Sequence, residues 1–167
     1  MTWLLSYGQG TVSTYPTLTG TNSSTGITFS VSSTTPAEIT GMTNQFSTAS
    51  SCNIWVKVGG AGTPPGTISA ANGWTQVVTG ATVTTGAPPA AIPFGGVKIN
   101  IPANTPVGIH IQAVGGNTNY RTGVAGDQVI FTDGTFTVNV ADSVAYGGHP
   151  TPGFNPRRFL GSVTYAL

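Results

Sequence analysis

Alternation of apolar and polar residues dominates this chain. In residues 26–32 (GITFSVS) and 53–58 (NIWVKV) every second side chain is apolar, so that Ile54 and Val56 face away from Trp55. A period of two is that of a half-buried β-strand. Helical periodicity is nearly absent, and residues 35–46 (TPAEITGMTNQF) are the one stretch in which we expect a short turn of helix.

Two segments predict β-hairpins. Residues 97–114 alternate on both sides of the turn sequence PANTP, and residues 127–144 carry the turn signal Asp133-Gly134 between two alternating runs. The closing run, residues 159–167 (FLGSVTYAL), places Phe159, Val163 and Leu167 on one face. Each of these segments is therefore expected to contribute strands.

About eight short strands separated by Gly- and Pro-rich turns are typical of two antiparallel sheets packed face to face. We therefore predict an all-β fold, an antiparallel two-sheet β-sandwich of the jelly-roll or Greek-key type. The chain has 167 residues, which suits one domain. We divide it into an N-terminal arm or edge strands (residues 1–35) and the β-sandwich domain (residues 36–167).

The chain is nearly devoid of charge. Charged residues make up 5% of it, against roughly 25% in ordinary proteins, and the formal net charge is +1. Such a surface offers neither a basic footprint for nucleic acid nor a polybasic patch for anionic lipid. It also has little self-repulsion, which favours association. No apolar run is long enough to span a membrane, and residues 1–11 lack the features of a signal peptide.

Few residues could support catalysis or bind a metal. Glu38, Asp127, Asp133 and Asp142 are the only carboxylate side chains, and neither histidine, His110 or His149, has zinc-type spacing. His110 faces away from the apolar side of its run, which predicts a surface or subunit contact. Cys52 is the only cysteine, and a small buried side chain is its simplest interpretation. We predict no catalytic residue, no metal and no cofactor.

Aromatic and arginine side chains are the remaining candidates for binding. Trp55, Trp74 and Tyr120 are candidates for stacking on a glycan, with core or interface packing as the alternative for each. Trp3, Tyr7, Tyr15, Arg157 and Arg158 are candidates for contacts with other subunits or with a lattice. Pro156 suits the start of a strand, so one arginine is expected to point outward while the other lies over the rim and donates to loop carbonyls.

Four pieces of the chain carry a resemblance. GWTQV (residues 73–77), VKINIPANTPVGIHI (97–111), Tyr120 and NPRRFLGSVTYAL (155–167) occur in an order that resembles a β-sandwich module of bacterial extracellular and surface-anchored proteins. The likeness covers about residues 45–167; Asn104 replaces a glycine usual in that module, and His110 stands where an aromatic residue is common. The resemblance implies a sandwich and an extracellular setting, and it implies no catalytic residues.

These observations favour a non-enzymatic virion structural protein. We expect a bacteriophage capsid decoration (cement) protein that folds in the host cytoplasm and is located on the virion surface. The expected partners are copies of itself, as a homo-oligomer taken to be a trimer, and the major capsid protein or other virion proteins. The alternative is a receptor- or carbohydrate-binding module of a phage tail fibre or of a bacterial surface adhesin, with a cell-surface glycan as ligand. Two further hypotheses for the function are a fragment of a larger secreted adhesin and a hydrolase.

Overall fold

The chain folds as antiparallel β-sheets. The computed structural model describes residues 8–20, 22–62 and 65–167. Each ladder between its named strands is antiparallel, and a single 3-10 turn, η1 (Ala70–Asn72), is the only helical element of the described residues. Within this part of the chain, no helix is long and apolar enough to cross a membrane. The all-β class predicted from the sequence is confirmed.

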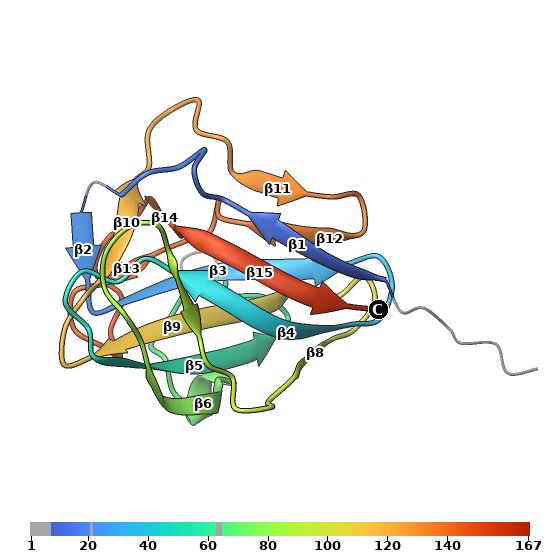
Figure 1. Cartoon of the computed structure of the whole chain (residues 1–167), viewed down its shortest axis with the longest axis horizontal. Coiled ribbons are helices and arrows are strands. Elements are labelled where there is room, and N and C mark those ends of the chain that lie inside the picture. Colours follow the sequence, from blue (N-terminus) through green and yellow to red (C-terminus); the bar gives the residue numbers. More distant parts are fainter. Residues whose placement is uncertain (1–7, 21, 63–64) are drawn as a thin grey trace, which may run out of the picture.

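One larger sheet contains five strands, and Figure 1 shows the first and last strands of the chain side by side in it. The edge strand β1 pairs with β15, β15 pairs with β4, and both β7 and β8 pair with the far side of β4. The strands are β1 (Gln9–Ser13), β15 (Gly161–Ala166), β4 (Ala37–Asn44), β7 (Ala90–Ile92) and β8 (Ile99–Ile101).

The other larger sheet has seven strands, in the order β11-β12-β3-β9-β5-β6, with β13 also paired to β3. These are β11 (Ile130–Thr132), β12 (Phe136–Asn139), β3 (Gly26–Ser33), β9 (Val107–Val114), β5 (Ser51–Val58), β6 (Thr75–Thr82) and β13 (Ala145–Tyr146). A small third sheet joins β14 (Arg157–Arg158), β10 (Thr118–Thr122) and β2 (Asn22–Ser24). This small sheet carries the predicted arginine pair.

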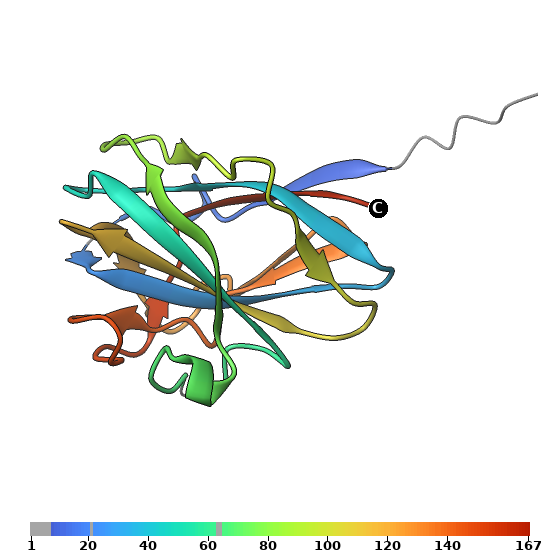
Figure 2. The same ribbon diagram turned by 90° about the horizontal axis from the view of Figure 1, so that it is seen from below.

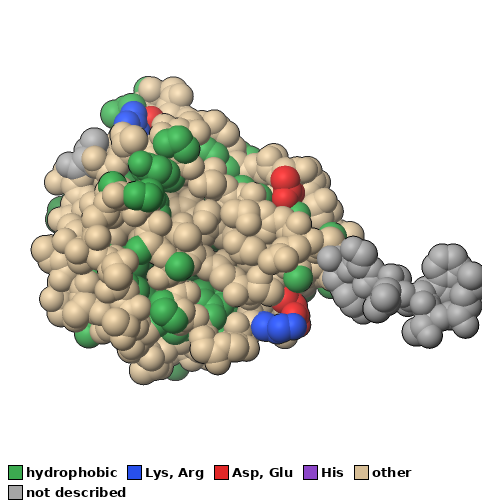
Figure 3. Space-filling model, in the orientation of Figure 1, with side chains coloured by type: hydrophobic (Ala, Val, Ile, Leu, Met, Phe, Trp, Pro, Cys, Tyr) green, Lys and Arg blue, Asp and Glu red, His purple; other side chains and the backbone are tan. Residues whose placement is uncertain are grey.

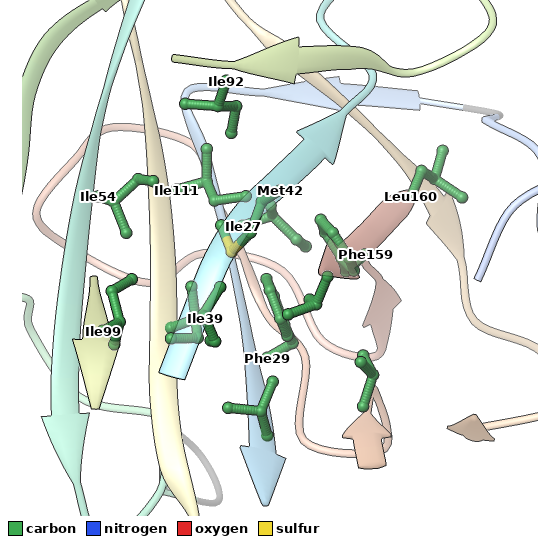
Figure 4. Close-up of a cluster of buried hydrophobic side chains, with 14 of the residues drawn as sticks. Ile27, Phe29, Ile39, Met42, Ile54, Ile92, Ile99, Ile111, Phe159 and Leu160 are labelled. Carbon is green, nitrogen blue, oxygen red and sulfur yellow. The ribbon is translucent and has the colours of Figure 1, made fainter. Parts of the chain in front are cut away.

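The main core lies between the two larger sheets, which Figure 2 shows as two layers. Ile27 and Phe29 of β3 point from the seven-stranded sheet toward Ile39 of β4, and all three are fully buried (Figure 4). The ring of Phe29 stacks on that of Phe159 with centroids 4.0 Å apart. Full burial of one such side chain contributes roughly 1.5–3 kcal/mol, so this layer is the main source of stability. The arrangement is sandwich-like.

The predicted helical turn at residues 35–46 is wrong. These residues form β4, an interior strand between β15 on one side and β7 and β8 on the other. Ala37, Ile39 and Met42 of this strand are buried in the core. Strand pairing on both edges and burial of these side chains override the local sequence, in which Glu38 and Gln45 suggest a helix.

One predicted hairpin is wrong and the other is confirmed. β8 pairs with β4 in the five-stranded sheet, whereas β9 pairs with β3 and β5 in the seven-stranded sheet, so residues 97–114 cross from one layer to the other. β11 and β12 do form a hairpin. Its turn is closed by the hydrogen bond from Asp133 N to Phe136 O (3.3 Å), and the Asp133 carboxylate accepts from the backbone N–H groups of Thr135 and Phe136.

The predicted boundary between residues 35 and 36 does not separate two structural units. β1 is an edge strand, as expected for part of the N-terminal segment. β3, in contrast, lies between β9 and the strands β12 and β13, and its Ile27, Phe29 and Val31 are buried. The strand at residues 26–33 is therefore interior to the seven-stranded sheet, because both of its edges are paired.

Candidate functional site

The small sheet brings two arginines face to face. In the pairing of β10 with β14, Arg121 lies opposite Arg158 and Thr122 lies opposite Arg157. Like charges directly opposite each other on neighbouring strands are destabilising. A carboxylate between them is therefore needed, and Asp127, in the loop after β10, supplies it.

Asp127 is fixed by several donors. Its Oδ1 accepts from Arg121 Nε at 3.0 Å and lies 2.9 Å from Arg121 Nη2, while its Oδ2 accepts from the backbone N–H of Val124 at 2.9 Å. Arg158 Nε lies 3.9 Å from Oδ2, an ion-pair distance too long for a hydrogen bond. The hydrogen bond from Arg121 is the main cause that lowers the pKa of Asp127. This carboxylate is therefore ionised, and both of its oxygens already accept hydrogen bonds, which makes it unsuitable as an acid or base.

Arg158 is the buried member of the arginine pair. It is 7% exposed, and its Nη1 donates to the carbonyl of Val140 at 3.1 Å. A Cβ added at Gly123 would lie 2.8 Å from Arg158 Cζ, so the guanidinium occupies space that only glycine leaves open. Arg158 thus holds the loop after β12 to β14, the rim position expected from the alternation of β14.

Arg157 points the other way, onto two aromatic rings. Its Cζ lies 5.3 Å from the ring centroid of Tyr120 and 5.5 Å from that of Phe154. Both distances are those of cation–π contacts. Its Nη1 donates to the carbonyl of Pro156 at 2.7 Å, and its backbone N–H donates to Ser143 O at 3.1 Å. The guanidinium is held in place, yet no ion pair to it is found among the described residues.

The predicted glycan-stacking residues are mostly buried. Trp74 is 1% exposed and Tyr120 is 4% exposed, so neither presents a free ring face to a sugar in this chain. Trp55 is half-buried; its Nε1 donates to Gln112 Oε1 at 3.3 Å, and Asn53 Nδ2 donates to the same oxygen at 2.9 Å. Of the three candidates, Trp55 alone keeps exposed surface.

Three of the predicted contact residues, Trp3, Tyr7 and Tyr15, lie near the N-terminus. Trp3 and Tyr7 lie outside the described residues. Tyr15 follows the edge strand β1 and is half-buried. Its role as a subunit contact therefore stays a prediction.

The prediction that His110 lies on the surface is wrong. His110 is fully buried beneath a second small core that covers the outer face of the seven-stranded sheet, formed by Ala61, Ile68, Trp74, Val144 and Tyr146. His110 Nε2 lies 3.2 Å from His149 Nδ1, and the ring of Tyr146 lies 4.6 Å away, centroid to centroid. Burial, with a smaller contribution from the charge of His149, holds the pKa of His110 well below its usual value. A neutral imidazole is therefore the stable form.

The remaining titratable groups also serve the fold. Asp142 Oδ2 accepts from Ser30 Oγ at 2.6 Å, Asp133 Oδ2 accepts from the Tyr165 hydroxyl at 2.6 Å, and Glu38 pairs with Lys98 at 2.6 Å. Burial raises the pKa of the free Cys52 thiol to about 12, as expected for a buried small side chain. Within the described ranges, no group of three or more His, Cys, Asp or Glu side chains is placed to hold a metal ion.

A groove of about 600 Å³ lies where β4, β8 and β15 meet at one end of the five-stranded sheet. The ion pair between Lys98 and Glu38 forms part of its wall. These two side-chain charges neutralise each other. The other lining residues are Pro36, Ala37, Asn100, Ile101, Pro102, Ala166 and Leu167.

No protein-family model matches the chain, and no curated protein matches it. Evidence for the function therefore comes mainly from the exposed surface. In the face shown in Figure 3, the backbone and side chains that are neither hydrophobic nor charged predominate, with hydrophobic side chains among them and charged groups at only a few places.

The sequence indicates Arg157 and Arg158 as contact candidates, with Asp127 as one of four possible ion partners for them, but it does not indicate Arg121 or Phe154 as parts of the same site. A signal for Arg121 was present, because a chain with nine charged residues places it only six positions before Asp127. Phe154 had no such signal. It is 43% exposed and comes from the loop between β13 and β14, so only the fold brings its ring to Arg157.

Proposed function

We propose that this chain is a non-enzymatic structural protein of a virus particle, a capsid decoration (cement) protein that works by binding copies of itself and neighbouring coat subunits. The observation that carries the proposal is the use of charge: Asp127, Asp133, Asp142 and Glu38 all have partners within the fold. A surface left nearly neutral has little repulsion against association. We infer that the chain folds in the host cytoplasm and is then located on the particle surface. We also infer that it forms a homo-oligomer, taken to be a trimer.

Two further observations support this proposal. The sandwich-like arrangement of the two larger sheets agrees with the resemblance to modules of bacterial extracellular proteins, and we infer a two-sheet sandwich of the jelly-roll or Greek-key type. The edge strand β1 (QGTVS) has neither a charged residue nor a proline, the usual devices that keep a sheet edge from pairing with other chains. An edge of this kind suits a protein that functions in an assembly.

The test is to purify the virus particles from the system that produces this chain and to image them. We expect the chain in the purified particles by mass spectrometry, and its density at fixed positions repeated over the capsid lattice. Absence of the chain from the particles would overturn the proposal, and density confined to the tail would favour the fibre alternative.

A second candidate function, binding of a cell-surface glycan as a receptor-binding module, is favoured by Trp55. Its ring is partly exposed and is flanked by the side-chain amides of Asn53 and Gln112, a combination suited to stacking on a sugar and hydrogen bonding to its hydroxyls. Binding on a glycan array that Trp55→Ala abolishes and the buried-site variant Trp74→Phe retains would support this function. An array without any binding would remove it.

A further inference from the structure

Arg157 combines a fixed position with an unneutralised charge. The rings of Tyr120 and Phe154 and the carbonyl of Pro156 hold its guanidinium. Its Nε is buried and has no hydrogen-bond partner in the described part of the chain. An arginine held in this way loses little side-chain entropy when it binds an anion, and its planar fork matches a carboxylate.

The chain itself has no carboxylate side chain to spare for Arg157. It contains four, and each already has a donor: Glu38 from Lys98, Asp127 from Arg121, Asp133 from Tyr165 and Asp142 from Ser30. The carboxylates of a second copy are occupied in the same way. These donors favour a carboxylate on a different polypeptide as the counter-ion of Arg157.

The surroundings of Arg157 favour a protein partner. Three of the five cationic residues, Arg121, Arg157 and Arg158, lie at this end of the molecule. The nearby carboxylates are Asp127 and Asp142, which precedes Ser143, so the local charge is still positive. Arginine beside aromatic rings is the composition of binding hot spots between proteins, and Phe154 is 43% exposed. Nucleic acid would need a broader basic stripe than one free arginine provides.

We propose that Arg157, held between Tyr120 and Phe154, is the binding site for the carboxylate of an Asp or Glu side chain on a different polypeptide. This inference rests on the proposed function, because it gives the chemistry of the contact between this chain and its neighbour in the particle. Arg157 and the carboxylate form charge-assisted hydrogen bonds, and Phe154 excludes water from them.

The test uses the arginine side-chain N–H signals in NMR spectra of the full chain. The probe is a blocked Ala-Glu-Ala-Glu-Ala peptide, compared with the Ala-Gln-Ala-Gln-Ala peptide and with inorganic phosphate at equal ionic strength. We expect the Glu peptide to shift the Arg157 signal saturably and to leave that of Arg121 in place, because Arg121 is already paired. Arg157→Gln should weaken binding on the order of tenfold.

Lys57→Gln is the matched control, since it removes an equal charge that has no ion pair in the described structure. It should leave the affinity for the Glu peptide unchanged. Equal shifts with both peptides, tighter binding of phosphate, or equal loss in the two variants would overturn the inference. If the chain is found on the particle and Arg157 shows no such binding, the inference fails and the proposed function stands. If Arg157 binds the Glu peptide as expected and the chain is absent from the particle, only the proposed function fails.

Discussion

At the scale of single residues, two neighbouring arginines have opposite environments. Arg158 is 7% exposed and bonds to Val140 O, while Arg157 lies half-buried against two aromatic rings. Alternation along a strand accounts for this difference, because successive side chains point to opposite faces. Arg158 is thus a stabilising residue, and Arg157 is the candidate for binding.

Substitution of Arg158 should be far more destabilising than that of Arg157. Arg158→Ala removes one of the two donors of the Val140 carbonyl, the other being the backbone N–H of Ser143, and leaves a space beside Gly123. It also leaves Asp127 with one cation fewer, and we expect a loss of about 2–4 kcal/mol of unfolding free energy. Arg157→Ala should cost less than about 1 kcal/mol, since its contacts are partly exposed. Urea unfolding followed by tryptophan fluorescence measures both. Equal losses would contradict the assignment of the two roles.

The histidine pair predicts a loss of stability in mild acid. The pKa of His110 is lowered in the folded state by burial and by His149, so the unfolded chain binds a proton near pH 6.5 while the folded chain does not. Stability is therefore complete above about pH 6.5 and falls as the pH drops below it, by up to about 1.4 kcal/mol per pH unit for this group.

The measurement for the histidine pair is the unfolding free energy of the chain and of His110→Gln between pH 7 and 5. The variant should lose the part of the pH slope that His110 contributes and keep the part from His149, because burial lowers the pKa of His149 as well. Burial also raises the pKa of Asp142, which acts in the opposite direction, so the difference between the two proteins is the quantity to compare. Identical slopes would show that His110 is not the group responsible.

At the scale of elements, the sequence predicted where the strands lie better than it predicted which strands pair with one another. The alternation in residues 26–32 correctly indicated the side chains that face the core, because a period of two reports the two faces of a strand. In residues 159–167 it was right for Phe159 and Val163 and wrong for Leu167, which is exposed. The alternation carries no information about the neighbouring strand. The turn sequence between Pro102 and Pro106 is equally suited to a hairpin and to a crossing between layers, and the structure has the crossing.

The candidate site was only partly predictable for the same reason. The Arg157-Arg158 pair stood out in a chain with few charges, but the aromatic ring of Phe154 and the carboxylate of Asp127 reach it through the pairing of β10 with β14. The second core over β9 was also missed, because the loops that cover His110 show no periodicity. Loops that cover the outer face of an alternating strand bury its side chains, and the alternation of that strand gives no sign of this burial.

Close contact between β9 and one of these loops gives a test. A Cβ at Gly108 would lie 2.6 Å from the backbone nitrogen of Ala61, so Gly108→Ala must push the loop off the sheet. We expect a loss of about 1–3 kcal/mol of unfolding free energy. Gly66→Ala, whose Cβ meets no described residue within 4 Å, is the matched control and should be nearly neutral. Hydrogen exchange in residues 59–62 should rise in Gly108→Ala only.

At the scale of the whole molecule, the central feature is how charge is used. Nine charged residues serve mainly to fix loops and strands, as in the pairs of Asp127 with Arg121 and Asp133 with Tyr165, and little net charge is left outside. We expect such a surface to attract nucleic acid little and to repel its own copies little. Association is the function that this distribution favours.

Sedimentation equilibrium of the purified chain over a wide concentration range tests this account most directly. We predict a mass that rises with concentration from the 16.9 kDa of one chain toward three times that value. The midpoint should change little with ionic strength, because few unpaired charges take part. A single species at 16.9 kDa over the whole range, in low and high salt alike, would contradict the claim that this surface is built for self-association.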